Sequence, residues 1–262
     1  MEKALFITRN DQFAEWNSEF SRLYYGQEFC ERLLPSEKEF LSMLTLVKRN
    51  KINFTLVTPF VGEQGLRKVV DLLENLKSEL GGLPEIVVND WGVFAYLHSA
   101  GFTNPLVLGR LLVKQKRGPQ ILKLQGKIPE ETVDHFKRAS ADAPSFTEFL
   151  RQNRFTRLEL DNLPLGLVRE EGDIQASLYY PYAYITTTRL CLFARYAKRH
   201  LRAIGPCQRE CRDFQLKLTH PDMPLPIIVA GNTQFYEKAE LPRNAEELGI
   251  NRLVYQPEVP AG

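Results

Sequence analysis

Short apolar runs alternate with helix-like segments along this chain, and this alternation restricts the fold more than any other sequence feature. Most of the runs are rich in β-branched or aromatic residues and end at Gly, Asn, Asp or Pro, as buried parallel strands do. The expected strands are Ala4–Thr8, Arg22–Tyr25, Asn53–Val57, Glu85–Val88, Pro105–Leu108, Arg157–Leu160, Tyr182–Thr187 and Arg252–Tyr255. Eight strands separated by helices favour a closed (β/α)8 barrel of the TIM type over an open sheet.

Helix start and stop signals lie between several of these strands. Ser36 precedes one helical pattern, and Glu39 stands where it would complete a capping box. Gly81-Gly82 ends another pattern, because glycine commonly terminates helices. The expected helices cover residues 37–50, 63–80, 91–99 and 146–153, with Ser36, Asp90 and Ser145 as N-cap residues of the first, third and fourth.

No internal repeat, low-complexity block or Pro/Gly/Ser-rich linker divides the 262 residues. We therefore expect residues 1–262 to form a single barrel-like domain. The alternation is interrupted over about 189–218, an insertion that carries three of the four cysteines. Long loops after barrel strands lie at the C-terminal face, where binding and catalysis occur.

Charge balance and the length of the apolar runs indicate which partners and which cellular compartment to expect. The balance of 34 Lys+Arg against 32 Asp+Glu does not support a nucleic-acid-binding surface. The first apolar run is too short for a signal peptide, and no run approaches the ~18 apolar residues of a membrane span. We expect a cytoplasmic protein, in which cysteines more often bind metal or take part in catalysis than form disulfides.

The four cysteines have a distinctive spacing. Cys30 lies far upstream, and Cys191, Cys207 and Cys211 form a C-x15-C-x3-C run. Cys30 and Cys191 each follow an expected strand by a few residues, so both should lie at the C-terminal face of the barrel. Cys207 and Cys211 are four residues apart, and a helical turn would place both sulfur atoms on one side. The spacing allows four thiolates to converge.

Four converging thiolates suit either a [4Fe-4S] cluster or a zinc ion. Structural zinc sites usually have two close pairs of ligands, whereas only Cys207 and Cys211 form a close pair here. A cluster accepts scattered ligands because each cysteine binds a separate iron. The basic residues around the motif, Arg189 and Arg212 among them, would offset its negative charge. Unrelated buried thiols are the third alternative.

Three segments resemble a known family. Arg22-Leu-Tyr-Tyr-Gly26 followed by Cys30, and Val88-Asn-Asp-Trp-Gly92, resemble peptidase family U32. The order of the four cysteines and Leu163-Pro164-Leu165 resemble its UbiV-type members. The resemblance implies a barrel-like fold, an oxygen-sensitive [4Fe-4S] cluster on the four cysteines, and oxygen-independent hydroxylation, as in ubiquinone biosynthesis. It also implies a heterodimer with a second family member, while other members imply a peptidase or an RNA-modification component.

Several other residues are candidates for a role in an oxygen-independent hydroxylase. We expect Tyr25, Asp90 and Arg189 to line its pocket, where tyrosine rings would suit a small planar aromatic substrate. Asp90 either accepts a substrate hydrogen bond or caps the next helix. One of Glu159 and Asp161 is expected to reach the barrel mouth as a general base. The alternative function is a non-catalytic partner subunit in which the metal is structural.

Overall fold

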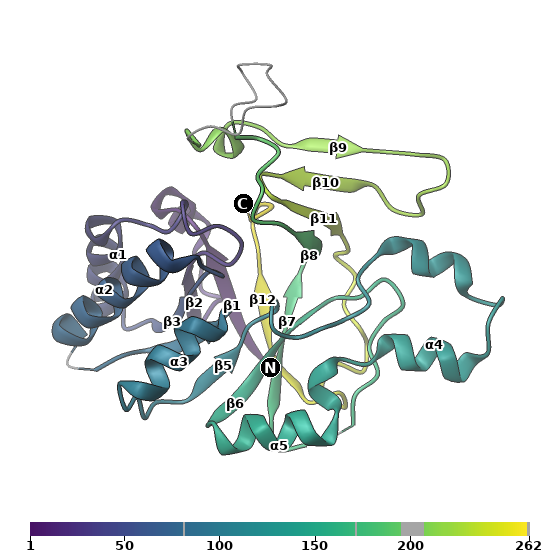
Figure 1. Ribbon diagram of the computed structural model, residues 1–262, viewed down its shortest axis with the longest axis horizontal. Helices are drawn as coiled ribbons and strands as arrows, with labels where there is room; N and C mark the ends of the chain where they lie inside the picture. The colour runs from purple at the N-terminus through teal and green to yellow at the C-terminus, as the bar shows by residue number, and fades with distance from the viewer. Residues whose placement is uncertain (81, 171, 195–206, 261–262) are drawn as a thin grey trace.

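The main unit of the protein is a closed barrel of parallel strands (Figure 1). The computed structural model describes residues 1–80, 82–170, 172–194 and 207–260. The eight strands follow one another around the barrel as β1 (Glu2–Ile7), β12 (Ile250–Tyr255), β7 (Gln175–Tyr180), β6 (Phe155–Asp161), β5 (Leu106–Leu108), β4 (Glu85–Val88), β3 (Asn53–Val57) and β2 (Arg22–Gly26). The predicted TIM-barrel-like fold is confirmed.

The seventh barrel strand differs from the prediction. Tyr182–Thr187 is a strand, β8, but it lies outside the barrel. Its expected place is taken by β7, which pairs in parallel with β6 and β12. Gln175 and Ser177 interrupt the apolar pattern of β7, because alternate residues of a barrel strand face an interior that is polar here. A search for continuous apolar runs therefore misses this strand.

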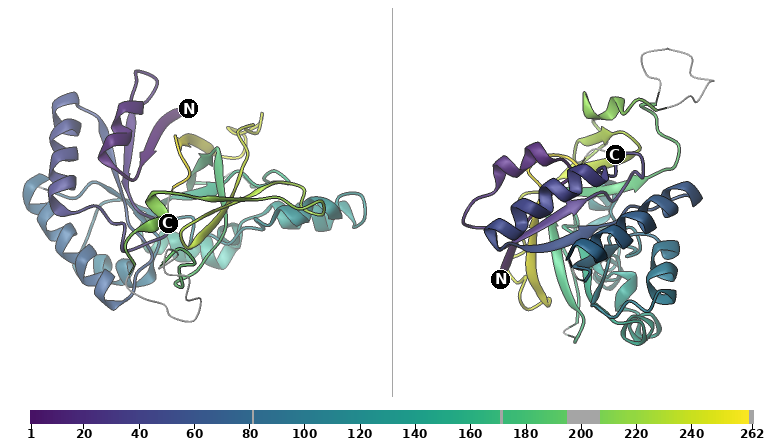
Figure 2. Two further views of the ribbon diagram at one scale, coloured as in Figure 1. Left: turned by 90° about the horizontal axis from the view of Figure 1, so that it is seen from above. Right: turned by 90° about the vertical axis from the view of Figure 1, so that its left-hand side faces the viewer.

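The helices pack against the outside of the barrel, with α1, α2 and α3 together on one side (Figures 1 and 2). Their bounds are α1 (Glu37–Asn50), α2 (Glu63–Leu80), α3 (Trp91–Ser99), α4 (Glu130–Lys137) and α5 (Pro144–Gln152). The capping box of Ser36 and Glu39 is present at the start of α1. The expected cap at Ser145 is wrong, because Pro144 already occupies the first turn of α5.

A small antiparallel sheet lies over the C-terminal ends of the barrel strands (Figures 1 and 2). Its strands follow the order β8, β11 (Thr233–Glu237), β10 (Ile227–Ala230) and β9 (Leu216–Leu218). All four lie in the chain between β7 and β12, so the insertion is larger than the expected 189–218. No helix of the described residues is long and apolar enough to cross a membrane.

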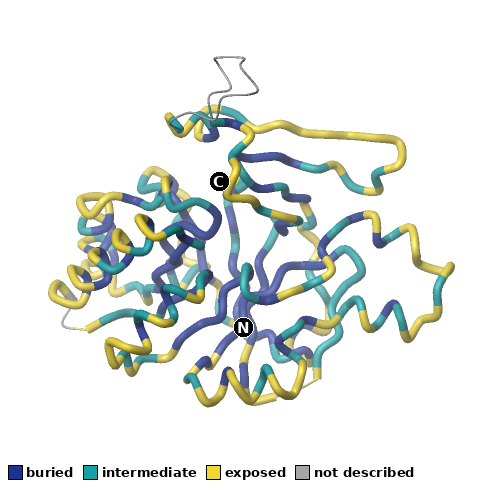
Figure 3. Tube along the Cα trace, in the orientation of Figure 1, coloured by how far each residue is buried: buried dark blue, intermediate teal, exposed yellow. Residues whose placement is uncertain are grey.

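The barrel strands present different chemistry on their two faces. The outward residues, such as Leu5, Leu23 and Ile86, join the apolar core beneath the helices, and most residues of the barrel strands are buried (Figure 3). Glu159 and Asp161 are both fully buried on the inner face. Residues two apart in a strand share a face, so both side chains point into the barrel. Asp161 does lie at the mouth, but Arg110 and Arg117 already pair with its carboxylate, so it is not the free general base that was expected.

Candidate functional site

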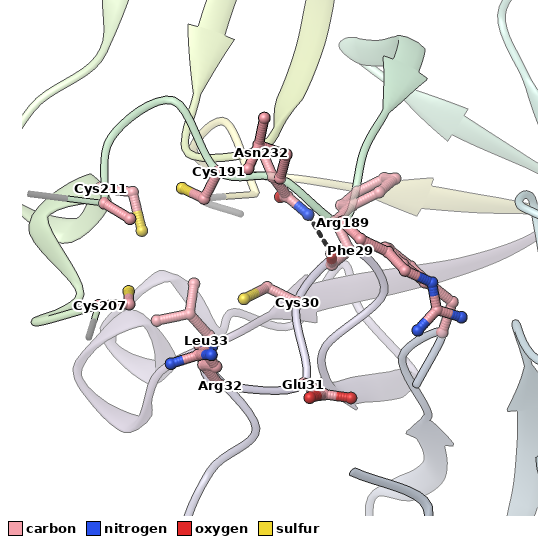
Figure 4. A pocket seen from close by; sticks show the side chains of 13 residues that line it. Phe29, Cys30, Glu31, Arg32, Leu33, Arg189, Cys191, Cys207, Cys211 and Asn232 are labelled. Atoms are coloured by element: carbon pink, nitrogen blue, oxygen red, sulfur yellow. Dashed lines mark hydrogen bonds between the residues drawn. The ribbon is translucent and has the colours of Figure 1, made fainter. Parts of the chain in front are cut away.

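The four cysteines line one cavity of about 160 Å³ between the barrel and the small sheet. Figure 4 shows their side chains pointing into a common space. Cys30 comes from the loop after β2, and Cys191 from the loop after β8. Cys207 and Cys211 come from the segment that leads into β9. The structure thus brings together four residues that the sequence separates by as much as 181 positions (211 − 30).

Local geometry explains how these loops reach the cavity. Gly26 ends β2 with a φ of +139°, and a Cβ there would lie 2.1 Å from the carbonyl oxygen of Val57. Only glycine allows the chain to turn this close to β3 on its way to Cys30. At the other side, Cys211 lies in a short 3₁₀ turn, Glu210–Arg212, and is buried. Cys207 precedes this turn, so the two cysteines do not share the expected helical turn.

Backbone N–H groups lie close to the cysteine sulfur atoms. The Arg209 N–H donates to the Sγ of Cys207 at 3.3 Å. The backbone N–H groups of Arg32 and Leu33 lower the pKa of Cys30, and those of Phe193 and Ala194 lower the pKa of Cys191, although burial outweighs them. Such donors favour the charged thiolate over the neutral thiol. The loops are therefore shaped to receive anionic sulfur.

Without a bound cation, most of these thiols would hold their protons. Burial raises the pKa of Cys30 and Cys191, and neighbouring thiolates raise it further. Burial and the other three cysteines raise the pKa of Cys211 to about 12. Four thiolates in one cavity repel one another, so a cationic group that binds them relieves this repulsion and releases protons.

The donor set of four thiols can be compared with what a single ion and a cluster require. A zinc ion needs all its sulfur ligands at about 2.3 Å. Within the described parts of the chain, no three His, Cys, Asp or Glu side chains are grouped in a way that could hold one metal ion. A [4Fe-4S] cluster binds each cysteine at a different iron, so its four sulfur ligands stay further apart. Four thiols around a common cavity match such a cluster in ligand type and number.

Asn232 ties two of the cysteine loops together. Its Nδ2 donates to the carbonyl oxygens of Phe29 and Thr188, both at 2.7 Å (Figure 4 shows the bond to Phe29). Its Oδ1 accepts from the hydroxyl of Thr233 at 3.1 Å, which fixes the orientation of the amide. Phe29 directly precedes Cys30, and Thr188 directly follows β8 in the loop that leads to Cys191. Sequence reasoning missed Asn232, whose role depends on two distant carbonyl groups.

The mouth of the barrel is filled by a buried ion network. Arg110 is fully buried, pairs with Glu28, and also pairs with Asp161 at 2.8 Å. Arg117 pairs with the same Asp161 at 2.6 Å. The Arg110 guanidinium lies 3.9 Å from the ring centre of Tyr179. Because this layer closes the barrel interior, the cysteine cavity lies beside the mouth, under the small sheet.

Of the other three residues expected to line the pocket, only Arg189 lines the cysteine cavity. Tyr25 does not line the pocket: it is buried beneath α1, 4.8 Å from the Phe40 ring. Strand alternation turns Tyr24 into the barrel and Tyr25 outward. Asp90 caps α3 by accepting the Gly92 N–H at 2.7 Å, and lines a neighbouring groove. Arg189 lines both that groove and the cysteine cavity.

Comparisons with known proteins give only distant similarities. No protein-family model and no curated protein matches the chain. The solved structure of the U32 peptidase Mk0906 aligns with a TM-score of 0.49 at 11% identity, over 100% of this chain and 94% of that one. A glycoside hydrolase family 18 N-acetylglucosaminidase from Paenibacillus barengoltzii aligns at 0.39 with 9% identity, over 97% and 94%. Similarities this low do not assign the chain to a family.

Proposed function

We propose that this chain is an iron–sulfur protein in which Cys30, Cys191, Cys207 and Cys211 hold one [4Fe-4S] cluster. The convergence of these cysteines on one cavity is the observation that carries the proposal. Backbone N–H groups near the sulfur atoms support it, because such donors stabilise thiolate ligands. Zinc is the less favoured occupant because structural zinc sites usually have two close pairs of ligands in the sequence, and only Cys207 and Cys211 form such a pair.

The residues around the cysteines would set the reduction potential of a bound cluster. A cluster supplies one-electron transfer, with a potential that depends on hydrogen bonds to sulfur and on exposure to solvent. Leu33, Phe193 and Val229 are almost completely buried and pack with Cys211. These side chains exclude water from one side of the cavity. The N–H groups near Cys30, Cys191 and Cys207 would favour the more negative, reduced state.

The reaction that we propose is oxygen-independent hydroxylation, with this chain acting as one component of a heterodimer with a second member of the same family. The resemblance of the Cys30 segment and the cysteine order to UbiV-type proteins motivates this choice. The filled barrel mouth supports a location outside the barrel, because Arg110 leaves no open interior for a substrate. A cluster that only stabilises a non-catalytic subunit is the competing function.

Single Cys-to-Ser substitutions test the assignment of ligands. Anaerobic reconstitution of the wild type with iron and sulfide should give a paramagnetic signal after reduction. Cys207→Ser should lose that signal or alter its line shape, because serine replaces one thiolate at the cluster. Circular dichroism of the same variant separates the two functions: a folded but inactive variant favours catalysis, and an unfolded one favours a structural cluster. An unchanged signal in Cys207→Ser would contradict the proposed ligand set.

A further inference from the structure

The cysteine cavity continues into a second hollow at the same end of the barrel. This groove has a volume of about 630 Å³ and lies between the loops after β3, β4 and β5 and the strand β8. Phe60 and Arg189 line both the cavity and the groove. A molecule bound in the groove would therefore lie beside the cysteines.

The guanidinium of Arg189 lies where the cavity and the groove meet, and contacts with neighbouring residues fix its position. Its guanidinium lies 5.3 Å from the ring centre of Phe60, and its Nη2 donates to the carbonyl oxygen of Val61 at 3.0 Å. Among the described side chains, no carboxylate forms a salt bridge with it. The nearby Glu31 instead accepts the Gly62 N–H at 2.6 Å. An arginine fixed in place without a carboxylate partner is suited to bind an anionic ligand.

The rest of the groove has a mixed lining that includes the indole of Trp91, the carboxylate of Asp90 and two further cations, Lys114 and Arg117, of which Arg117 is paired with Asp161. Trp91 is 43% exposed, although it also packs on Phe94 and Phe149. An exposed indole beside a groove suits a planar ligand. The carboxylate of Asp90 already accepts the N–H groups of Val61 at 3.1 Å and Gly92 at 2.7 Å, which compensates its charge.

We infer that this groove binds a small organic anion with a planar apolar body, and that Arg189 binds its carboxylate next to the cysteine centre. The inference deepens the proposed function by naming a substrate class for the same site. The guanidinium would bind the carboxylate, while Trp91 and Phe60 would contact the planar body. The anion would then lie between the indole and the cysteines.

The fluorescence of Trp91 can report ligand binding in the groove. The chain has two tryptophans, Trp16 and Trp91, so Trp16→Phe leaves Trp91 as the sole indole reporter. Benzoate added to anaerobic Trp16→Phe protein should change the fluorescence saturably, and the neutral isostere benzamide should bind far more weakly. Arg189→Gln in that background should weaken benzoate binding by roughly tenfold or more, as expected for a lost hydrogen bond to a charged group.

A matched control uses Arg49→Gln, which removes an exposed arginine from the last turn of α1 and should leave benzoate binding unchanged. The inference is overturned by the absence of a saturable signal, by equal binding of benzamide, or by full binding in Arg189→Gln. Iron is measured in the same samples. Anaerobic Trp16→Phe protein that binds benzoate but holds no iron would reject only the cluster, whereas iron-loaded protein without benzoate binding would reject only the groove.

Discussion

At the scale of single residues, the spacing of the cysteines predicted that they could lie close together, but not which side chains hold their loops in place. Cys30 and Cys191 follow strands, and strands of a barrel end at one face, so their proximity follows from the fold class. Tyr25 was predicted to line the pocket, but the register of β2 turns it toward α1. Asn232 carries no sequence signal, because its partners are backbone carbonyl groups that the sequence does not distinguish.

Asn232→Ala should loosen the cysteine site without unfolding the protein. The substitution leaves the carbonyl oxygens of Phe29 and Thr188 without their donor, and Asn232→Asp would place a negative charge against both. We expect both variants to lose iron to a chelator faster than the wild type, with Asp the faster. Asn50→Ala, at an exposed position of α1, is the control. Iron loss at the wild-type rate would show that Asn232 does not position the loops.

Glu159 should make the stability of the protein depend on pH. Burial raises its pKa to about 8, so the folded protein keeps a proton that the unfolded chain loses near its ordinary value of 4.5. Between these two values the folded state binds more protons, and the contribution of Glu159 to stability falls as the pH rises. The slope for one proton is at most about 1.4 kcal/mol per pH unit.

The neutral isostere Glu159→Gln removes this titration and can still accept the hydrogen bond from the Tyr24 hydroxyl, which is 3.0 Å long in the wild type. The variant should therefore be more stable than the wild type near pH 8, with a smaller difference near pH 5. Urea unfolding at several pH values measures the difference in unfolding free energy. A difference that stays constant with pH would mean that Glu159 is ionised in the folded protein.

At the scale of elements, the predictions succeeded where local signals act alone. The bounds of α2 and α3, and the capping box of α1, follow from caps and periodicity within each segment. The assignment of the seventh barrel strand failed because Tyr182–Thr187 reads as a strand while polar residues interrupt the pattern of β7, and only tertiary pairing shows that β7 joins the barrel. Local sequence does not contain that information.

Ser36→Ala tests the start of α1. The Ser36 side chain accepts the Glu39 N–H, and the Glu39 carboxylate accepts the Ser36 N–H at 2.7 Å. Loss of the cap should reduce the unfolding free energy by about 1 kcal/mol, which thermal unfolding followed by circular dichroism can detect. Ser78→Ala, at an exposed position inside α2, provides the comparison and should not destabilise. Equal stability of the two variants would exclude a contribution from the cap.

At the scale of the whole molecule, the alternation of strands and helices was sufficient to predict the barrel. It did not predict the sheet over the mouth or the ion network beneath it. Arg110 joins the two parts: it pairs with Glu28 and Asp161 and donates to the carbonyl oxygen of Tyr182 at 3.2 Å. Its guanidinium charge is compensated only in the assembled fold, so no local pattern marks this arginine.

Arg110→Met should therefore affect the entire molecule. It would leave Glu28 and Asp161 buried with one partner fewer, and loss of one member of a buried ion network costs roughly 3–5 kcal/mol. Arg151→Met, which removes an exposed ion pair with Asp173, should change stability little. Chemical unfolding of both variants gives the comparison. Similar stability of the two would show that the buried network does not hold the sheet on the barrel.

The cluster proposed on Cys30, Cys191, Cys207 and Cys211 is the central claim, and it explains why the fold brings four cysteines to one cavity. The most direct test is the iron, acid-labile sulfide and zinc content of protein purified without oxygen. We expect about four iron and four sulfide per chain and no stoichiometric zinc. A colourless protein that contains one zinc per chain, or neither metal, would contradict the claim.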